Sequence, residues 1–213
     1  MRAVVRKTKP FREEIRMKNA IIALILGGAV QLATAQEQVS REEALKVALL
    51  THCDLTPLAT LPVRVDADLK YPFALRAGEY GAMILPETKL TAEALVRAGR
   101  DPVPLGELWA RKLTLVCDGQ PCAASKLFLV TLPRQEGGVP VFALAVRQGK
   151  EGQLELLVYG KDKQPLLTVP LKKATAKQEY PLELTADPQG DQGRLTIRVC
   201  GKYEAELTMA KAD

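Results

Sequence analysis

Four cysteines are the residues of this chain whose spacing most directly suggests covalent chemistry. Cys117 and Cys122 flank residues 118–121, Asp-Gly-Gln-Pro, which are typical of a hairpin loop that brings two thiols face to face. We expect these two cysteines to form a disulfide. Of the three connectivities that four cysteines allow, elimination then pairs Cys53 with Cys200. Chain-entropy estimates are about 2 kcal/mol for the short loop and about 5 kcal/mol for the long one.

The same cysteines leave two other chemistries open. Cys117 and Cys122 could form a redox pair, although four residues separate them and thioredoxin-like motifs have two. His52 and Cys53 could join other cysteines at zinc, which accepts nitrogen and sulfur ligands. An oxidising compartment favours disulfides over both alternatives.

Histidine and serine are scarce, which argues against a hydrolase with a catalytic triad. His52 is the only histidine, and its place at the end of a predicted helix suits a favourable interaction with the helix dipole. The only serines, Ser40 and Ser125, lie at a predicted helix cap and a predicted strand start. We therefore expect no catalytic, cofactor-binding or metal-binding residues. A pair of glycosidase carboxylates has no sequence signature, so a glycan-active enzyme remains an alternative.

Aromatic side chains make up only 5% of the chain. Trp109 is the single tryptophan, and together with Tyr71 and Tyr80 it is the best candidate for a platform on which a sugar ring could stack. The alternative is that Trp109 packs in the core.

The first 35 residues have the three parts of an export signal: a basic start, an apolar run over residues 20–30, and the small-residue site Ala33-Thr34-Ala35 before Gln36. The apolar run is about half the length of a membrane-spanning helix. Met17 stands directly before it, so residues 1–16 could be an upstream extension from a misassigned start. We expect a mature chain of residues 36–213, periplasmic or extracellular, with no integral membrane segment.

The net charge of +5 lies entirely in this leader. Residues 1–35 hold seven of the 30 basic and two of the 25 acidic residues, which leaves 23 of each in the mature chain. A domain with no overall basic field is a poor nucleic-acid binder.

The elements that must position these residues are mostly strands. Ser40 and Glu43 form a capping box before a helix predicted over residues 41–51, and a second short helical segment is predicted over 90–99. The two prolines in residues 101–104 suggest a stiff connector and a sub-boundary near 100–105. Short apolar runs broken by turn residues predict eleven strands: 61–69, 71–76, 80–85, 111–117, 126–132, 139–147, 154–159, 166–171, 180–185, 194–200 and 203–209.

Three of these segments indicate the fold. Residues 194–200 and 203–209 alternate apolar and polar around a predicted Gly201-Lys202 turn, as expected for a hairpin with one wet face. Residues 141–146 are apolar throughout, as expected for a strand covered on both faces. The sequence thus predicts a mainly β, two-layer antiparallel sandwich with a short N-terminal helix and one short helical insertion.

Function follows less directly from the sequence. We expect an exported, non-enzymatic module that binds another envelope protein or a glycan. The alternatives are a carbohydrate-binding module or carboxylate-based glycan enzyme, and a thiol-active protein.

Overall fold

The computed structural model describes residues 36–55, 61–132, 137–175 and 177–212. For residues 53–55 it describes the helical backbone alone. The predicted export signal and its cleavage site lie in residues 1–35, outside the described part.

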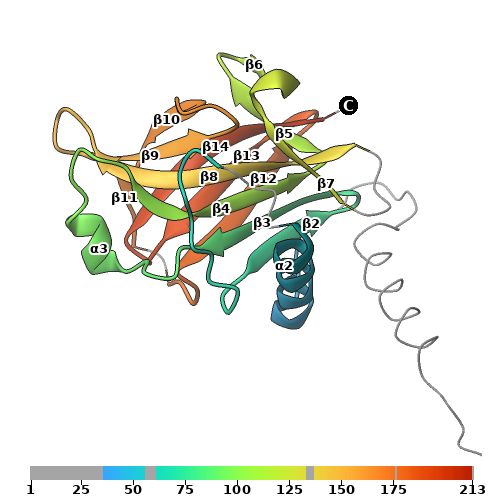
Figure 1. The fold of residues 1–213 in the computed structure, drawn as a ribbon, viewed down its shortest axis with the longest axis horizontal. Coiled ribbons are helices and arrows are strands. Elements are labelled where there is room, and N and C mark those ends of the chain that lie inside the picture. Colours follow the sequence, from blue (N-terminus) through green and yellow to red (C-terminus); the bar gives the residue numbers. More distant parts are fainter. Residues whose placement is uncertain (1–35, 56–60, 133–136, 176, 213) are drawn as a thin grey trace, which may run out of the picture.

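The larger of two layers is an eight-stranded antiparallel sheet (Figure 1). Its strand order is β1-β2-β3-β4-β8-β9-β10, and β7 pairs with the first residues of β8. The strands are β1 (Glu37–Gln38), β2 (Phe73–Ala77), β3 (Tyr80–Pro86), β4 (Val103–Arg111), β7 (Phe128–Thr131), β8 (Gly138–Gln148), β9 (Leu154–Tyr159) and β10 (Leu167–Pro170).

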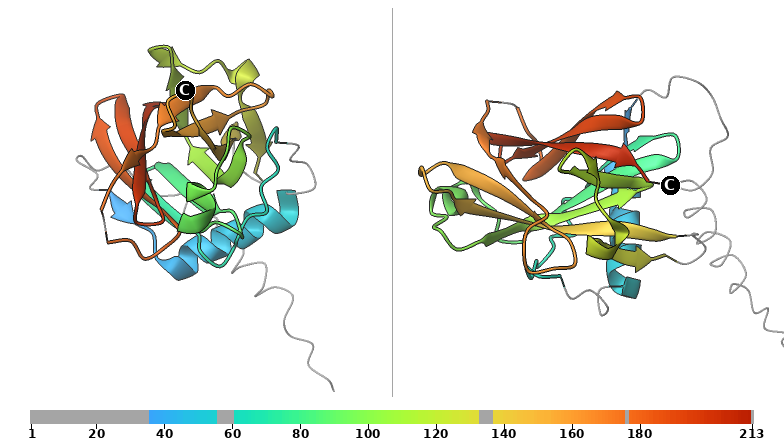
Figure 2. Two further views of the ribbon diagram at one scale, coloured as in Figure 1. Left: turned by 90° about the vertical axis from the view of Figure 1, so that its left-hand side faces the viewer. Right: turned by 90° about the horizontal axis from the view of Figure 1, so that it is seen from above.

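The smaller layer is a six-stranded antiparallel sheet that stacks on the larger one (Figure 2, right). Its strand order is β12-β13-β14-β5-β6, and β11 pairs with β14. The strands are β5 (Leu113–Cys117), β6 (Gln120–Pro121), β11 (Lys172–Lys173), β12 (Leu182–Gln189), β13 (Gln192–Val199) and β14 (Tyr203–Lys211). The predicted two-layer antiparallel sandwich is confirmed.

β8 shows why the larger sheet is buried on both faces. Phe142, Leu144 and Val146 point into the main core between the two sheets, where all three are fully buried. The alternate residues Ala143 and Ala145 are equally buried on the outer face. The run of apolar residues in this strand therefore reflects cover on two sides, as expected.

A helix covers part of that outer face. α2 (Arg41–Leu55) runs four residues beyond its predicted end and packs Ala44 and Ala48 against the larger sheet, on the side away from the smaller one (Figure 2, right). Ser40 caps the helix by accepting a hydrogen bond from the Glu43 N–H. The Glu43 carboxylate lies 3.7 Å from the Arg76 guanidinium on β2.

The predicted strand over residues 61–69 is not formed. Its only ladder contact is an isolated bridge between Ala67 and Glu87. Leu61, Val63 and Val65 instead pack across the outer face of the larger sheet, against Ala143, Ala145, Leu157 and Tyr159. The alternating pattern therefore reflects burial of one side of the segment and not membership of a sheet.

The connector predicted over residues 101–104 is also corrected, because β4 begins at Val103 and pairs with both β3 and β8. The second helix, α3 (Ala92–Val96), is shorter than its predicted segment and is capped by the Thr91 hydroxyl. A single turn of 3-10 helix, η2 (Ala124–Lys126), follows β6. The final hairpin turns on Cys200 and Gly201, which both have positive φ, and not on Gly201 and Lys202 as expected.

Candidate functional site

A register shift in β4 determines which of its side chains reach the outer face. The pairing of β4 with β8 shifts between Pro104 and Gly106, a bulge that places one extra residue in the strand. Leu105 and Leu108 both face the main core as a result. Glu107 and Trp109 are thereby directed to the opposite face, under α2.

Glu107 is a buried carboxylate that receives two hydrogen bonds there. Only 6% of the residue is exposed, and its Oε2 lies 3.1 Å from Trp109 Nε1 and 3.1 Å from His52 Nε2 in the last turn of α2. The His52 and Trp109 rings are 6.3 Å apart between centroids. Buried charge is costly unless hydrogen bonded, so this cluster ties α2 to the larger sheet.

The Thr51 hydroxyl of α2 forms its hydrogen bonds within the helix. Thr51 is buried and donates to the carbonyls of Val47 and Ala48, one turn earlier in the same helix. The arrangement of His52, Glu107 and Trp109 fits a structural anchor, in which the imidazole and indole hold the carboxylate. Sequence reasoning missed Glu107, although its two-residue spacing from Trp109 within an apolar segment was a signal that both share a buried face.

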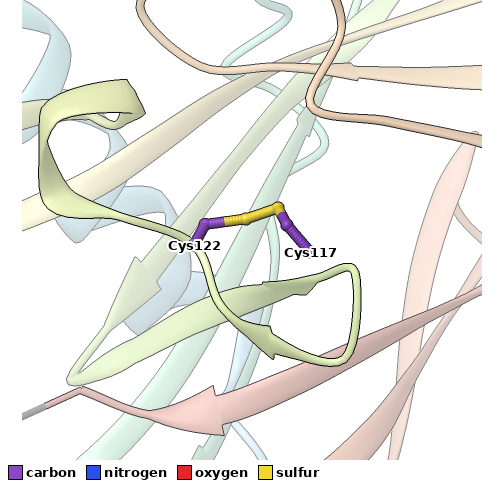
Figure 3. The surroundings of a disulfide bond; sticks show 2 residues. All are labelled: Cys117 and Cys122. Carbon is purple, nitrogen blue, oxygen red and sulfur yellow. A yellow bond between two sulfur atoms is a disulfide. The ribbon is translucent and has the colours of Figure 1, made fainter.

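The predicted disulfide between Cys117 and Cys122 is present (Figure 3). Their Cα atoms are 5.1 Å apart across the hairpin of β5 and β6, where Cys117 pairs with Gln120. Asp118 and Gly119 both have positive φ, as a tight hairpin turn requires. Cys122 is buried in the main core, so the bond anchors the hairpin to the interior.

The predicted link between Cys53 and Cys200 is contradicted, because Cys200 has a free thiol. The larger sheet explains the difference. Cys200 packs against the core between the sheets, whereas α2, which contains Cys53, lies on the outer face. Burial, with a smaller contribution from the Glu93 carboxylate, raises the pKa of the Cys200 thiol.

The three aromatic residues considered for sugar stacking are not brought together. Trp109 is buried beneath α2 with 8% of its surface exposed, so its indole offers no open face. Tyr71 is exposed before β2, where the Arg41 guanidinium lies 5.9 Å from its ring centroid. Tyr80 lies elsewhere, in a groove between the sheets.

This groove is a hollow of the described surface that could hold a ligand. It has a volume of about 260 Å³ and opens between β2 and β3 of the larger sheet and β12, β13 and β14 of the smaller one. Its apolar lining comes from one end of the main core and is formed by Leu75, Ala82, Leu113, Leu195 and Met209.

Charged and polar side chains form the rim of the groove. Of the charged residues that line it, Arg76 directs its guanidinium to Glu37 and Glu43 and Arg194 to Asp187, none of which lines the groove, and this leaves Lys211 and Asp191. Lys211 Nζ lies 2.8 Å from Asp191 and 5.7 Å from the Tyr80 ring centroid. The hydrogen bond and the charge of Lys211 lower the pKa of Asp191.

Gln36, the first described residue, also lines the groove. Its side-chain oxygen accepts a hydrogen bond of 3.2 Å from the Ala186 N–H on β12, while Glu37 and Gln38 pair with β2. The start of the predicted mature chain therefore contacts both sheets beside the groove.

No group of three or more histidine, cysteine, aspartate or glutamate side chains in the described part of the chain is placed to hold a metal ion. Among the helices described, none is long and apolar enough to cross a membrane.

Comparison with known proteins adds no relative to this description. No protein-family model, no curated protein and no solved structure matches the chain.

Proposed function

We propose that this chain is an exported, non-enzymatic binding module that holds its ligand in the groove between the two sheets. The observation that carries the proposal is the groove itself, a hollow of about 260 Å³ that is lined by apolar residues of the main core and has Lys211 and Asp191 beside it. A concave, mostly apolar lining with a few polar groups is typical of binding sites. The three-part leader supports export.

The other functions considered have less support. Stacking of a sugar on Trp109 conflicts with the burial of its ring under α2. A thiol-active function conflicts with the Cys117–Cys122 disulfide and with the raised pKa of Cys200, since the thiolate is the reactive form.

The test uses a neutral apolar dye, N-phenyl-1-naphthylamine, whose fluorescence rises in apolar surroundings. We expect the purified exported protein to bind the dye at one site. Ala186 lines the groove from β12, so Ala186→Trp fills it and should lower the affinity at least tenfold.

Thr185→Trp is the matched control, because Thr185 is the neighbouring residue on β12 and does not line the groove. It should leave dye binding unchanged. Absence of dye binding, or equal binding by the two variants, would show that the groove is not the binding site.

A further inference from the structure

We infer that Gln36 is a modification site, at which the residue cyclises to pyroglutamate once the leader is removed, and that the Ala186 N–H promotes this reaction. The inference goes beyond ligand binding in the groove. It rests on the predicted cleavage after Ala35, which makes Gln36 the first residue of the mature chain.

The structure holds the backbone and the side chain of Gln36 from two directions. Residues 37–38 pair with β2, and the Val39 N–H donates to the Ala74 carbonyl at 3.0 Å. From the other sheet, the Ala186 N–H of β12 donates to the side-chain Oε1 at 3.2 Å. The residue itself is exposed, so its α-amino group has access to solvent after cleavage.

Cyclisation needs an uncharged amine and an electrophilic carbonyl, and Gln36 supplies both after cleavage. The freed α-amino nitrogen attacks Cδ of the same side chain and closes a lactam ring. The bond from Cδ to Nε2 breaks, and Nε2 leaves as ammonia with the proton that the amine gives up. The reaction needs no oxidant, reductant or other reactant. Because both reacting groups belong to one residue, ring closure has the advantage of an intramolecular reaction.

The Ala186 N–H acts on this reaction through Oε1. Negative charge develops on this oxygen as the amine adds to Cδ, and an N–H aimed at the oxygen stabilises that charge. Ala186 belongs to a strand paired with β13, so its N–H is in position before the reaction begins. Solvent weakens the effect at an exposed residue. We therefore expect an acceleration of about fivefold, as for one ordinary hydrogen bond.

The product retains what the structure uses at this position. The lactam keeps a carbonyl oxygen at Cδ, so an acceptor for the Ala186 N–H remains. It has no α-ammonium group, so the mature chain starts without a positive charge beside the groove that Gln36 lines.

The experiment follows the intact mass of the exported protein over time at about pH 8, where about half of the α-amino groups are uncharged. The mass should begin at that of residues 36–213 and then fall by the mass of one ammonia. A synthetic peptide of residues 36–41, incubated under the same conditions, gives the rate without Ala186. We expect Gln36 to cyclise about fivefold faster in the folded protein than in the peptide.

Two variants assign the effect to single groups. Ala186→Pro removes the N–H donor and should reduce the rate to that of the peptide. Pro188, on the same strand, shows that β12 accommodates a proline, and circular dichroism verifies that the variant folds. Gln36→Glu is the matched control. Its carboxylate is a poor electrophile, so its mass should stay constant.

A folded protein that cyclises no faster than the peptide, or an Ala186→Pro variant as fast as the original chain, would overturn the inference. A chain that retains its leader would overturn it together with the predicted cleavage. None of these results bears on the groove, because dye binding is measured separately.

Discussion

The carboxylate of Glu107 links α2 to the larger sheet through hydrogen bonds. Its Oε2 accepts from both Trp109 and His52, and only 6% of the residue is exposed. A buried acceptor that loses its hydrogen-bond donor is left unsatisfied, and the free-energy cost of removing it from water is then no longer offset. The contributions of Glu107 and Trp109 to stability should therefore depend on each other.

This dependence can be measured with a double-mutant cycle of Trp109→Phe and Glu107→Gln. We expect a coupling energy of about 1 kcal/mol in the free energy of unfolding. Urea unfolding followed by circular dichroism is suitable, because the tryptophan is absent from two of the variants. The control cycle replaces Glu107→Gln by Glu206→Gln on the wet face of β14, and its two mutations should be additive.

Cys200 should react slowly in the folded protein, because burial raises the pKa of its thiol. The test is the rate of alkylation by iodoacetamide across pH 7–10 in a Cys53→Ala background. We expect the rate at pH 8 to be several times lower in the folded chain than in urea, since the thiolate is the reacting form.

The same shift has a defined sign for stability. The neutral thiol is favoured by folding, so its contribution is fully present below the pKa of the unfolded chain and is lost as the pH rises through the higher folded pKa. Cys200→Ala should remove this loss of stability at alkaline pH. Equal alkylation rates in folded and unfolded chains would contradict the raised pKa.

At the residue scale, the sequence predicted what depends on local spacing. The disulfide of Cys117 and Cys122 follows from the turn between them. The groove lining does not, because it combines residues from strands far apart in the chain, such as Leu75 and Met209. The pairing proposed for Cys200 failed for the same reason, since elimination takes no account of the sheet that lies between α2 and the main core.

At the scale of elements, Gly106 is the residue that allows the bulge in β4. A Cβ atom there would lie 2.3 Å from the Leu85 carbonyl oxygen and 2.9 Å from a methyl group of Leu182. The first of these is backbone and cannot move aside without distorting β3. Gly106→Ala should cost about 3 kcal/mol in the free energy of unfolding.

The comparison for this variant is Gly99→Ala, because a Cβ at Gly99 meets nothing within 4 Å. Its effect should stay within about 0.5 kcal/mol. Chemical denaturation of both variants measures the difference, and a Gly106→Ala chain as stable as Gly99→Ala would show that the larger sheet adjusts to the added methyl group.

The disulfide hairpin gives a second prediction at this scale. Cys117→Ala combined with Cys122→Ala should lower the free energy of unfolding by about 2 kcal/mol, because the closed loop is short. Dithiothreitol should lower the stability of the original chain by a similar amount and leave the double variant unchanged. A reductant effect of the same size in both proteins would point to a different origin.

β4 also shows where sequence reasoning about elements fails. The two prolines before Leu105 suggested a connector, since proline lacks an N–H for a strand ladder. A bulge removes that objection by interrupting the ladder at Pro104, and the strand continues to Arg111. Only the partner strands β3 and β8 reveal this.

For the whole molecule, the sequence predicted the two sheets better than the segments that pack on their outer face. The two faces of β8 and the final hairpin were enough to predict a sandwich. The segment from Leu61 to Val65 has the same alternation as a strand and was therefore assigned as one, although it packs as a cover on the outer face.

The export prediction belongs to the whole molecule as well. Expressed with its own leader in a bacterial host, the protein should have the mass of residues 36–213, with Cys117 and Cys122 resistant to alkylation until reduction. Intact mass spectrometry before and after reduction measures both. A retained leader would contradict the predicted cleavage, and immediate alkylation of Cys117 and Cys122 would contradict the disulfide.

The hydrogen bond from Ala186 to Gln36 also bears on how the molecules stay apart in solution. β12 is the outermost strand of the smaller sheet, and an open strand edge can recruit a strand from another molecule and begin aggregation. Gln36 occupies one outward N–H of this edge, and Pro188, two residues further on, has none to offer. We therefore expect Gln36, the first residue of the predicted mature chain, to hinder self-association through this strand edge. A mature chain that lacks residues 36–38 should become less soluble while it still folds.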